Sequence, residues 1–164
     1  INAATQDPSG GRIIREKDGK PTGVLVDRAM GLVARRIPAP EAEAVRRRIE
    51  RAARECARLG LTTVHDAGSS ERDMAAYREL VAAGKLTLRV YSMIGGAGAL
   101  WEQWRKRGPE VGEYLTVRSI KLVADGALGS RGAAMKEPYS DEPGHRGLSI
   151  LKKADVERVA KQAV

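Results

Sequence analysis

Lys121 is the residue of this sequence whose chemistry is hardest to explain by packing alone. It lies within an otherwise apolar run, Ile120-Lys121-Leu122-Val123-Ala124, which favours a β-strand. Strand alternation would place Lys121 on the same face as Val123 and Asp125. Because burial of an unpaired ammonium is costly, the side chain must form an ion pair, lose its proton, be chemically modified or reach water at a sheet edge. The residues alone leave these alternatives open, and Asp125 is one candidate partner.

A glycine-rich loop, residues 125–132, follows that strand. Its glycines recur at every third position, as in loops that bind phosphate groups through backbone N–H groups. The loop lacks the Lys-Ser/Thr ending of a P-loop, so a nucleotide site is not favoured. Arg131 is suited to an anionic group of a ligand. The candidate substrate-binding residues are Asp125, Gly126, Ser130 and Arg131.

His65 and Asp66 form a second candidate site, at the end of the β-branched run that begins at Leu61. His65 and His145 are the only histidines, and neither stands in a His-x-His or His-Glu-x-x-His pattern. A metal site therefore cannot be assembled from the histidine pattern. His65 is equally consistent with a hydrogen-bonded structural histidine.

Strands alternate with helices along most of the chain. Apolar spacing and turn residues predict a β-hairpin at 12–15 and 23–26, helices at 41–59, 70–83 and 100–106, and strands at 61–65, 86–93 and 116–124. The second helix begins with a capping-box pattern at residues 70–73, after a loop at 66–68, and a final helix includes Val156, Val159, Ala160 and Ala163. This order indicates an α/β fold with a parallel sheet, either doubly wound or part of a (β/α)₈ barrel of the TIM type. In both architectures ligands bind at the carboxyl ends of the strands. We expect two parts: a hairpin and linker region, 1–40, and a partial barrel segment with about three βα units, 41–164.

The composition favours a soluble, cytoplasmic protein. The 164 residues include one cysteine, and no apolar run approaches the roughly 18 residues of a membrane span. The first residues, 1–11, hold no initiator methionine or signal peptide, and the helical pattern is still running at Val164. We therefore expect the chain to be a segment of a longer protein.

The net charge of +8 raises a second class of function. Arginines gather between residues 46 and 58, so a basic nucleic-acid-associated domain with salt-dependent binding is one alternative. The same predicted helix also carries glutamates and no aromatic platform, which favours a solvated face. Another alternative is a stand-alone α/β module that binds an anionic ligand at the 125–132 loop.

Four sequence blocks stand out in order along the chain. They are Gly11-Arg12-Ile13-Ile14-Arg15 with Gly19-Lys20-Pro21-Thr22-Gly23-Val24-Leu25, then Gly60-Leu61-Thr62-Thr63-Val64-His65-Asp66-Ala67-Gly68, then Gly84-Lys85-Leu86-Thr87-Leu88-Arg89-Val90-Tyr91, and Ile120-Lys121-Leu122-Val123-Ala124-Asp125-Gly126-Ala127-Leu128-Gly129-Ser130-Arg131-Gly132-Ala133. In this order the blocks resemble the YtcJ-like branch of the metal-dependent amidohydrolases, also called amidohydrolase family 3.

The resemblance implies a (β/α)₈ barrel hydrolase that cleaves amide-type or other C–N bonds of a small molecule with a metal-activated water. The metal is commonly zinc in that family. Lys121 corresponds to the barrel lysine that such enzymes carboxylate and use as a metal-bridging ligand. A carbamate formed from a neutral lysine and carbon dioxide is an anion that adjacent cations stabilise.

The family's remaining metal ligands have no counterpart in this sequence. Its His-x-His motif would precede Ile1, and its His-Ala-Ile-Gly-Asp block would follow Val164. We therefore expect residues 1–164 alone to bind no metal and to be catalytically inactive. A partial barrel also leaves open sheet edges and uncovered apolar surfaces, which predicts a homo-oligomer.

Overall fold

The computed structural model describes residues 1–163, and their contacts divide the chain into two compact units. One unit combines residues 1–38 with residues 123–158, and the other combines residues 39–122 with the described residues from 159 onward. The division into domains at residue 40 stays a prediction. No helix among the described residues is long and apolar enough to cross a membrane.

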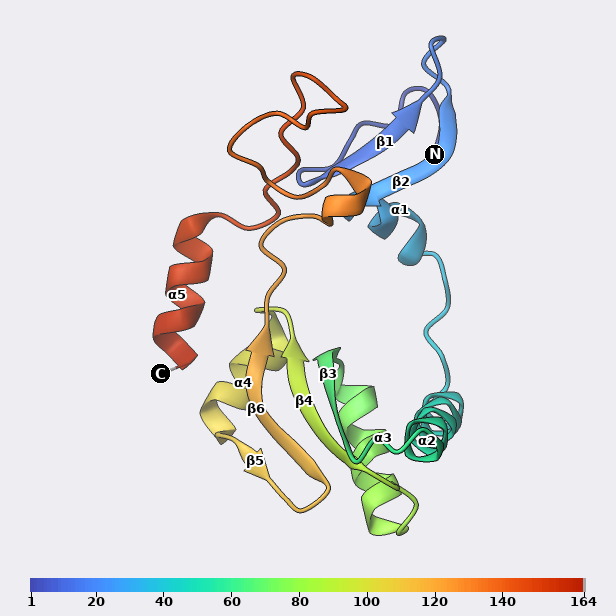
Figure 1. Cartoon of the computed structure of the whole chain (residues 1–164), viewed down its shortest axis with the longest axis vertical. Coiled ribbons are helices and arrows are strands. Elements are labelled where there is room, and N and C mark those ends of the chain that lie inside the picture. Colours follow the sequence, from blue (N-terminus) through green and yellow to red (C-terminus); the bar gives the residue numbers. More distant parts are fainter. Residues whose placement is uncertain (164) are drawn as a thin grey trace. The chain divides into compact units, whose positions relative to one another are not determined.

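A four-stranded sheet forms the centre of the second unit (Figure 1). Its strands are β3 (Thr63–Ser69), β4 (Arg89–Gly95), β5 (Glu110–Val111) and β6 (Leu115–Lys121), and they lie in the order β3-β4-β6-β5. Strands β3, β4 and β6 are parallel, whereas β5 pairs with β6 in the antiparallel direction. The predicted α/β fold with a parallel sheet is therefore confirmed, while the short β5 was not predicted.

Three helices connect or precede these strands: α2 (Ala42–Arg58), α3 (Glu71–Ala82) and α4 (Ala99–Arg107). Helix α3 begins at the predicted capping box, in which the Ser70 hydroxyl accepts from the Asp73 N–H and the Asp73 carboxylate accepts from the Ser70 N–H. Helix α2 turns Ile49, Ala53 and Cys56 toward the apolar core, and the predicted spacing included Ile49 and Cys56.

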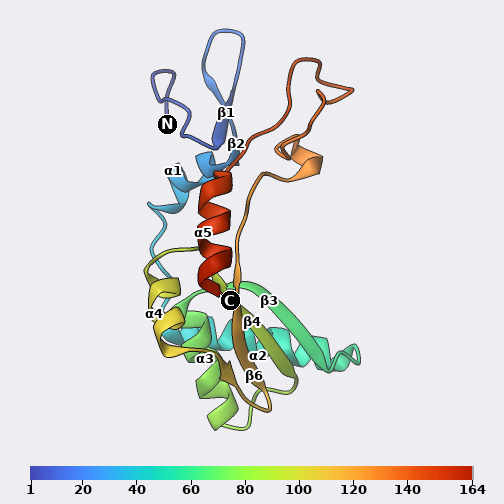
Figure 2. The same cartoon turned by 90° about the vertical axis from the view of Figure 1, so that its left-hand side faces the viewer.

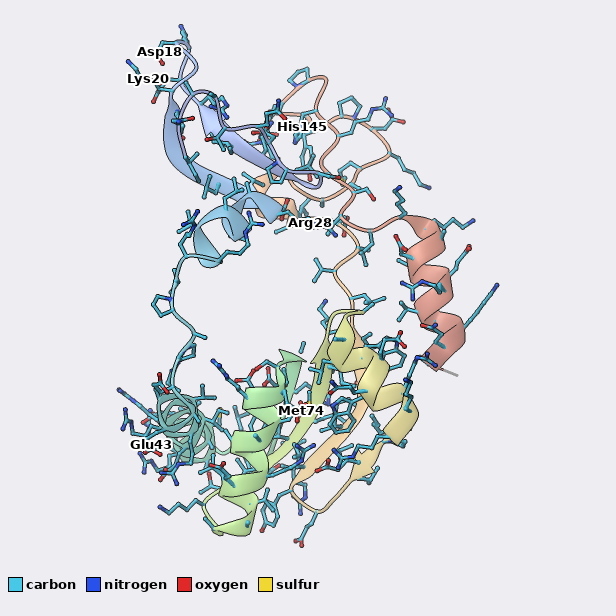
Figure 3. The ribbon with its side chains drawn as sticks, turned by 180° about the vertical axis from the view of Figure 1, so that it is seen from behind. Asp18, Lys20, Arg28, Glu43, Met74 and His145 are labelled. Carbon is cyan, nitrogen blue, oxygen red and sulfur yellow. The ribbon has the colours of Figure 1, made fainter. Side chains whose placement is uncertain are left out.

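The core of this unit lies on one face of the sheet. Val90, Ile94 and Val117 are buried with Met74 and Leu80 of α3, and with both tryptophans of α4, Trp101 and Trp104. Figure 2 shows α3 and α4 on one side of the strands, and Figure 3 shows Met74 of α3 on that side. Figure 1 presents the opposite face of β3, β4 and β6 toward the reader, and no helix covers these strands on that side. We call it the helix-free face.

The first unit contains a hairpin of β1 (Gly11–Arg15) and β2 (Pro21–Asp27), which confirms the predicted hairpin. Asp18 and Lys20 form an ion pair at its tip, 2.8 Å apart (Figure 3). Two short helices, η1 (Arg28–Met30) and α1 (Gly31–Ala34), follow the hairpin. The later segment of this unit holds η2 (Leu128–Ser130), and α5 (Lys153–Ala163) ends the described chain.

Strand ends are where the sequence predictions were wrong. Residues 66–68, predicted as a loop, continue β3 to Ser69, with a register shift between Ala67 and Ser69. In contrast, β6 ends at Lys121, three residues before the predicted end. Val123 and Asp125 are therefore not strand residues, and the alternation that was predicted to align them with Lys121 does not apply.

Candidate functional site

Lys121 is the last residue of β6, and the strand register fixes the face that it occupies. In β4, Val90, Ser92 and Ile94 point into the core, so the residues between them face the other way. Lys121 pairs in register with Gly95, which belongs to this second set. The Lys121 side chain therefore lies on the helix-free face, at the carboxyl end of a parallel strand, and it is exposed.

Gly95 allows the neighbouring strand to approach this position closely. A Cβ at residue 95 would lie 2.8 Å from the carbonyl oxygen of Gly68, which no real side chain tolerates. Gly68 itself has a φ of +129°, and it lies within the register shift of β3. The Gly68 backbone thus occupies the space that a side chain at residue 95 would fill, so β3 and β4 lie close together beside Lys121.

His65 lies on the same face as Lys121, in the middle of β3. It pairs in register with Tyr91, and the two rings meet edge to face with their centroids 5.1 Å apart. Tyr91 was not among the predicted site residues. The alternation of Arg89, Tyr91 and Met93 with buried residues could have indicated it, because alternation marks a second strand face.

Asp66, the other member of this predicted pair, faces the helices. Its Oδ2 atom accepts hydrogen bonds from the Tyr77 hydroxyl and the Ser69 hydroxyl, each at 2.8 Å. The Ser92 hydroxyl in turn donates to the Ser69 hydroxyl at 2.7 Å. Burial, followed by the hydrogen bond to Asp66 and the charge on Asp66, raises the pKa of Tyr77 above its ordinary value. Asp66 thus links β3 to α3 on the core side of the sheet.

The other candidate residues lie in the first unit, on the loop of residues 125–132. The Arg131 guanidinium forms two hydrogen bonds with the Asp141 carboxylate, at 2.6 and 3.1 Å, and approaches Glu142 at 3.7 Å. This pairing lowers the pKa of Asp141. In this arrangement Arg131 already has an anionic partner within its own unit.

Asp125 and Ser130 also make contacts within the loop region. The Asp125 carboxylate accepts from the Ala134 N–H at 3.0 Å, and the Ser130 hydroxyl donates to the Ala127 carbonyl at 3.2 Å. His145 donates through Nε2 to the Arg131 carbonyl at 2.8 Å, and its ring stacks on Tyr139. These contacts, all within the first unit, define the shape of the loop.

The donors in the described part of the chain do not complete a metal site. Residues 1–163 contain no group of three or more His, Cys, Asp or Glu side chains that could hold a metal ion. Lys121 would supply a single ligand after carboxylation, whereas a catalytic metal commonly has at least three protein ligands. The residues present therefore do not fit a metal by themselves.

The arginine-rich face of α2 is neutralised in part by its own glutamates. Arg46 and Arg47 approach Glu43 at 2.5 and 3.7 Å, and Arg54 approaches Glu50 at 3.2 Å. Pairs three or four residues apart are typical of a solvated helix surface. Nucleic-acid binding by this helix stays a prediction.

The structure thus defines a protein of the α/β class, in which one face of a parallel sheet carries His65, Tyr91 and Lys121. Comparison with known proteins shows the family. The sequence profile of the amidohydrolase family matches residues 1–164. The chain belongs to the amidohydrolase family.

Two curated relatives align with nearly the whole of this chain. The putative amidohydrolase YtcJ of Bacillus subtilis (strain 168) is 32% identical over 169 residues, which cover 99% of this chain and 31% of that protein. The N-substituted formamide deformylase of Arthrobacter pascens is 28% identical over 177 residues, or 99% of this chain and 32% of that protein. The chain thus spans about a third of the length of these relatives.

A solved structure shares the fold. The crystal structure of an uncharacterized metal-dependent hydrolase from Pyrococcus horikoshii OT3 matches with a TM-score of 0.76 and 24% sequence identity. The match covers 92% of this chain and 32% of that protein. The strand and helix arrangement described above is therefore a known one.

Proposed function

We propose that this chain is the lysine-bearing part of a metal-dependent amidohydrolase that hydrolyses amide-type or other C–N bonds of a small molecule. The observation that carries the proposal is the position of Lys121 at the carboxyl end of β6, on the helix-free face. In a closed (β/α)₈ barrel that face would line the interior, where such enzymes bind ligands. Family membership and the name of the formamide deformylase support the reaction class.

Lys121 would act as a carbamate. The neutral amine forms an N–C bond to carbon dioxide, the electron pair of one C=O π bond moves to its oxygen, and the nitrogen releases a proton. The product carries a negative charge where the ammonium carried a positive one, so it suits a cation. The exposed position of Lys121 leaves room for the longer side chain.

The complete site requires ligands that residues 1–163 do not contain. We propose a divalent metal, with zinc as the first candidate, a cytoplasmic location and a barrel in the complete protein. The proposed substrate-binding residues are Asp125, Gly126, Ser130 and Arg131. His65 is proposed as a site residue on the helix-free face that carries Lys121. Asp66, which is bonded to Tyr77 and Ser69, is proposed to support β3.

A chimera tests this proposal, because it places residues 1–164 within the rest of a full-length relative. Residues 1–164 replace the matched stretch of the Bacillus subtilis relative, to which they are 32% identical. We expect the chimera to bind a divalent metal and to hydrolyse N-acyl or N-formyl amines. Lys121→Ala should abolish both metal retention and hydrolysis.

Lys85→Ala is the matched control, because Lys85 is an exposed lysine in the turn between α3 and β4, away from the open face. It should retain both properties. A Lys121→Ala chimera that keeps its metal and its hydrolytic rate would contradict the proposal.

A further inference from the structure

Asp27, the last residue of β2, combines two unfavourable features that the proposed function does not explain. Its backbone has φ +51° and ψ −122°, a region that residues with side chains rarely adopt. Its Oδ2 atom is buried and has no hydrogen-bond partner among the described residues. A desolvated carboxylate oxygen without a donor costs stability. Such a residue persists where the surrounding structure holds it in place.

Gly126 and Gly132 are the residues that surround this oxygen. A Cβ built on either glycine would lie well under 3.0 Å from Asp27 Oδ2. Neither glycine has a positive φ, so the requirement for glycine arises from this close approach and not from backbone conformation. The Asp27 carboxylate thus occupies the space into which both side chains would project.

The two glycines form the neck of the 125–132 loop. The Gly126 N–H donates to the Gly132 carbonyl at 3.2 Å, and the Gly132 N–H donates to the Ala127 carbonyl at 2.9 Å. Ser130 and Arg131 lie between the two sides of the neck. Any change in the neck therefore changes the direction in which these two residues point.

A second contact from the hairpin reaches the same segment. Arg12 of β1 donates through Nη1 to Glu142 at 3.2 Å, and Glu142 also lies 3.7 Å from Arg131. The β1–β2 hairpin thus touches both the neck of the loop and the residues that hold Arg131. Both contacts lie within the first unit.

We propose that Asp27 is a positioning residue that sets the neck of the 125–132 loop through the shape of its carboxylate. Contact with the two glycines fixes the loop, and the loop presents Ser130 and Arg131. The effect on substrate rests on the proposed function, whereas the contact itself does not. Two sets of measurements separate these parts.

The first set uses the 164-residue chain and amide hydrogen exchange followed by NMR. Asp27→Gly relieves the backbone strain and removes the carboxylate, so the Gly126 and Gly132 amides should exchange about tenfold faster or more. Amides of the sheet, such as those of Val90 and Val117, should be unchanged. Asp27→Asn keeps the shape and should retain the slow exchange. Slow exchange at the neck in Asp27→Gly, or fast exchange in Asp27→Asn, would overturn the proposal.

Alanine substitutions in the loop provide a second readout. Gly132→Ala should open the neck in the native chain and should have a smaller effect in the Asp27→Gly background, because the contact with Asp27 Oδ2 at 2.5 Å is then gone and the remaining contacts are no closer than 3.2 Å. Gly126→Ala should be harmful in both backgrounds, since its Cβ would also meet the Gly132 backbone at 2.7 Å. Gly129→Ala is the control, with nothing within 4 Å of the added methyl group. Equal effects of Gly132→Ala in both backgrounds would overturn the inferred contact.

The functional part is measured in the chimera. Asp27→Gly should raise KM about tenfold with little change in kcat, and Asp27→Asn should restore KM. An unchanged KM in a chimera whose neck amides exchange rapidly would overturn the positioning role while leaving the hydrolase proposal intact. A chimera that is inactive with native Asp27 would instead count against the proposed function, and the exchange measurements would still decide the contact.

Discussion

Tyr77→Phe removes one hydroxyl from the network that links α3 to the sheet. The Tyr77 side chain is only 8% exposed, and its hydroxyl donates to Asp66 Oδ2 at 2.8 Å. A hydrogen bond to a charged group contributes about 1.5–3 kcal/mol. After the substitution Asp66 Oδ2 keeps the Ser69 hydroxyl as its donor. We therefore expect the free energy of unfolding to fall by about 2 kcal/mol.

The same substitution should change how stability depends on alkaline pH. Burial and the neighbouring Asp66 raise the pKa of Tyr77, so the folded state holds the phenolic proton more tightly than the unfolded state. The resulting stability is fully present below the ordinary tyrosine pKa, about 10, and is lost as pH rises toward the folded pKa. In this range one tyrosine contributes a slope of up to about 1.4 kcal/mol per pH unit.

Urea unfolding measures both effects. It is carried out at pH 7 and between about pH 9.5 and 11, a range that includes the ordinary tyrosine pKa. Tyr91→Phe is the control, because the Tyr91 hydroxyl makes no hydrogen bond among the described residues; its effect should stay within about 0.5 kcal/mol. Equal stability of Tyr77→Phe and the native chain at pH 7, or an equal alkaline slope, would refute the role assigned to this network.

Three further predictions concern stability, assembly and activity. Glu110 accepts hydrogen bonds from Arg78 at 2.8 Å and Arg107 at 3.0 Å, which lowers the pKa of Glu110. The resulting stability is present above the ordinary Glu pKa and is lost as pH falls. Glu110→Gln should therefore lower the free energy of unfolding by about 1–3 kcal/mol in urea at pH 7, and should make stability depend less on pH in the acid range. Because β3 is an edge strand and the opposite sheet face is open, sedimentation velocity at micromolar concentration should show a dimer or larger assembly, and a purely monomeric profile would contradict this. The purified 164-residue chain should not hydrolyse amides with added divalent metal, and a metal-stimulated rate proportional to its concentration would show that this is wrong.

Much of the fold could be predicted because its signals are local. The apolar spacing of α2, the capping box at Ser70 and the turn of the β1–β2 hairpin each depend on neighbouring residues. The strand ends could not be predicted, because the shift near Gly68 depends on how closely β3 approaches Gly95 of β4. That approach is a property of the assembled sheet.

The candidate site shows the same limit. The unusual position of Lys121 was visible in its apolar run, but its face became known only from the register with Gly95. Asp66 was grouped with His65, whereas strand alternation places them on opposite faces. Asp27 gave no signal in the sequence, since its contacts with Gly126 and Gly132 join residues about a hundred positions apart. Arg131 similarly acquires Asp141 only when its loop is folded.

Direct detection of a carbamate on Lys121 tests the central claim. The chimera is equilibrated with ¹³C-labelled bicarbonate and a divalent metal, and its ¹³C NMR spectrum is compared with that of Lys121→Arg. We predict a carbamate carbon signal that requires the metal, disappears on acidification and is absent from Lys121→Arg. A metal-loaded chimera without this signal, or a signal that persists in Lys121→Arg, would contradict the role assigned to Lys121.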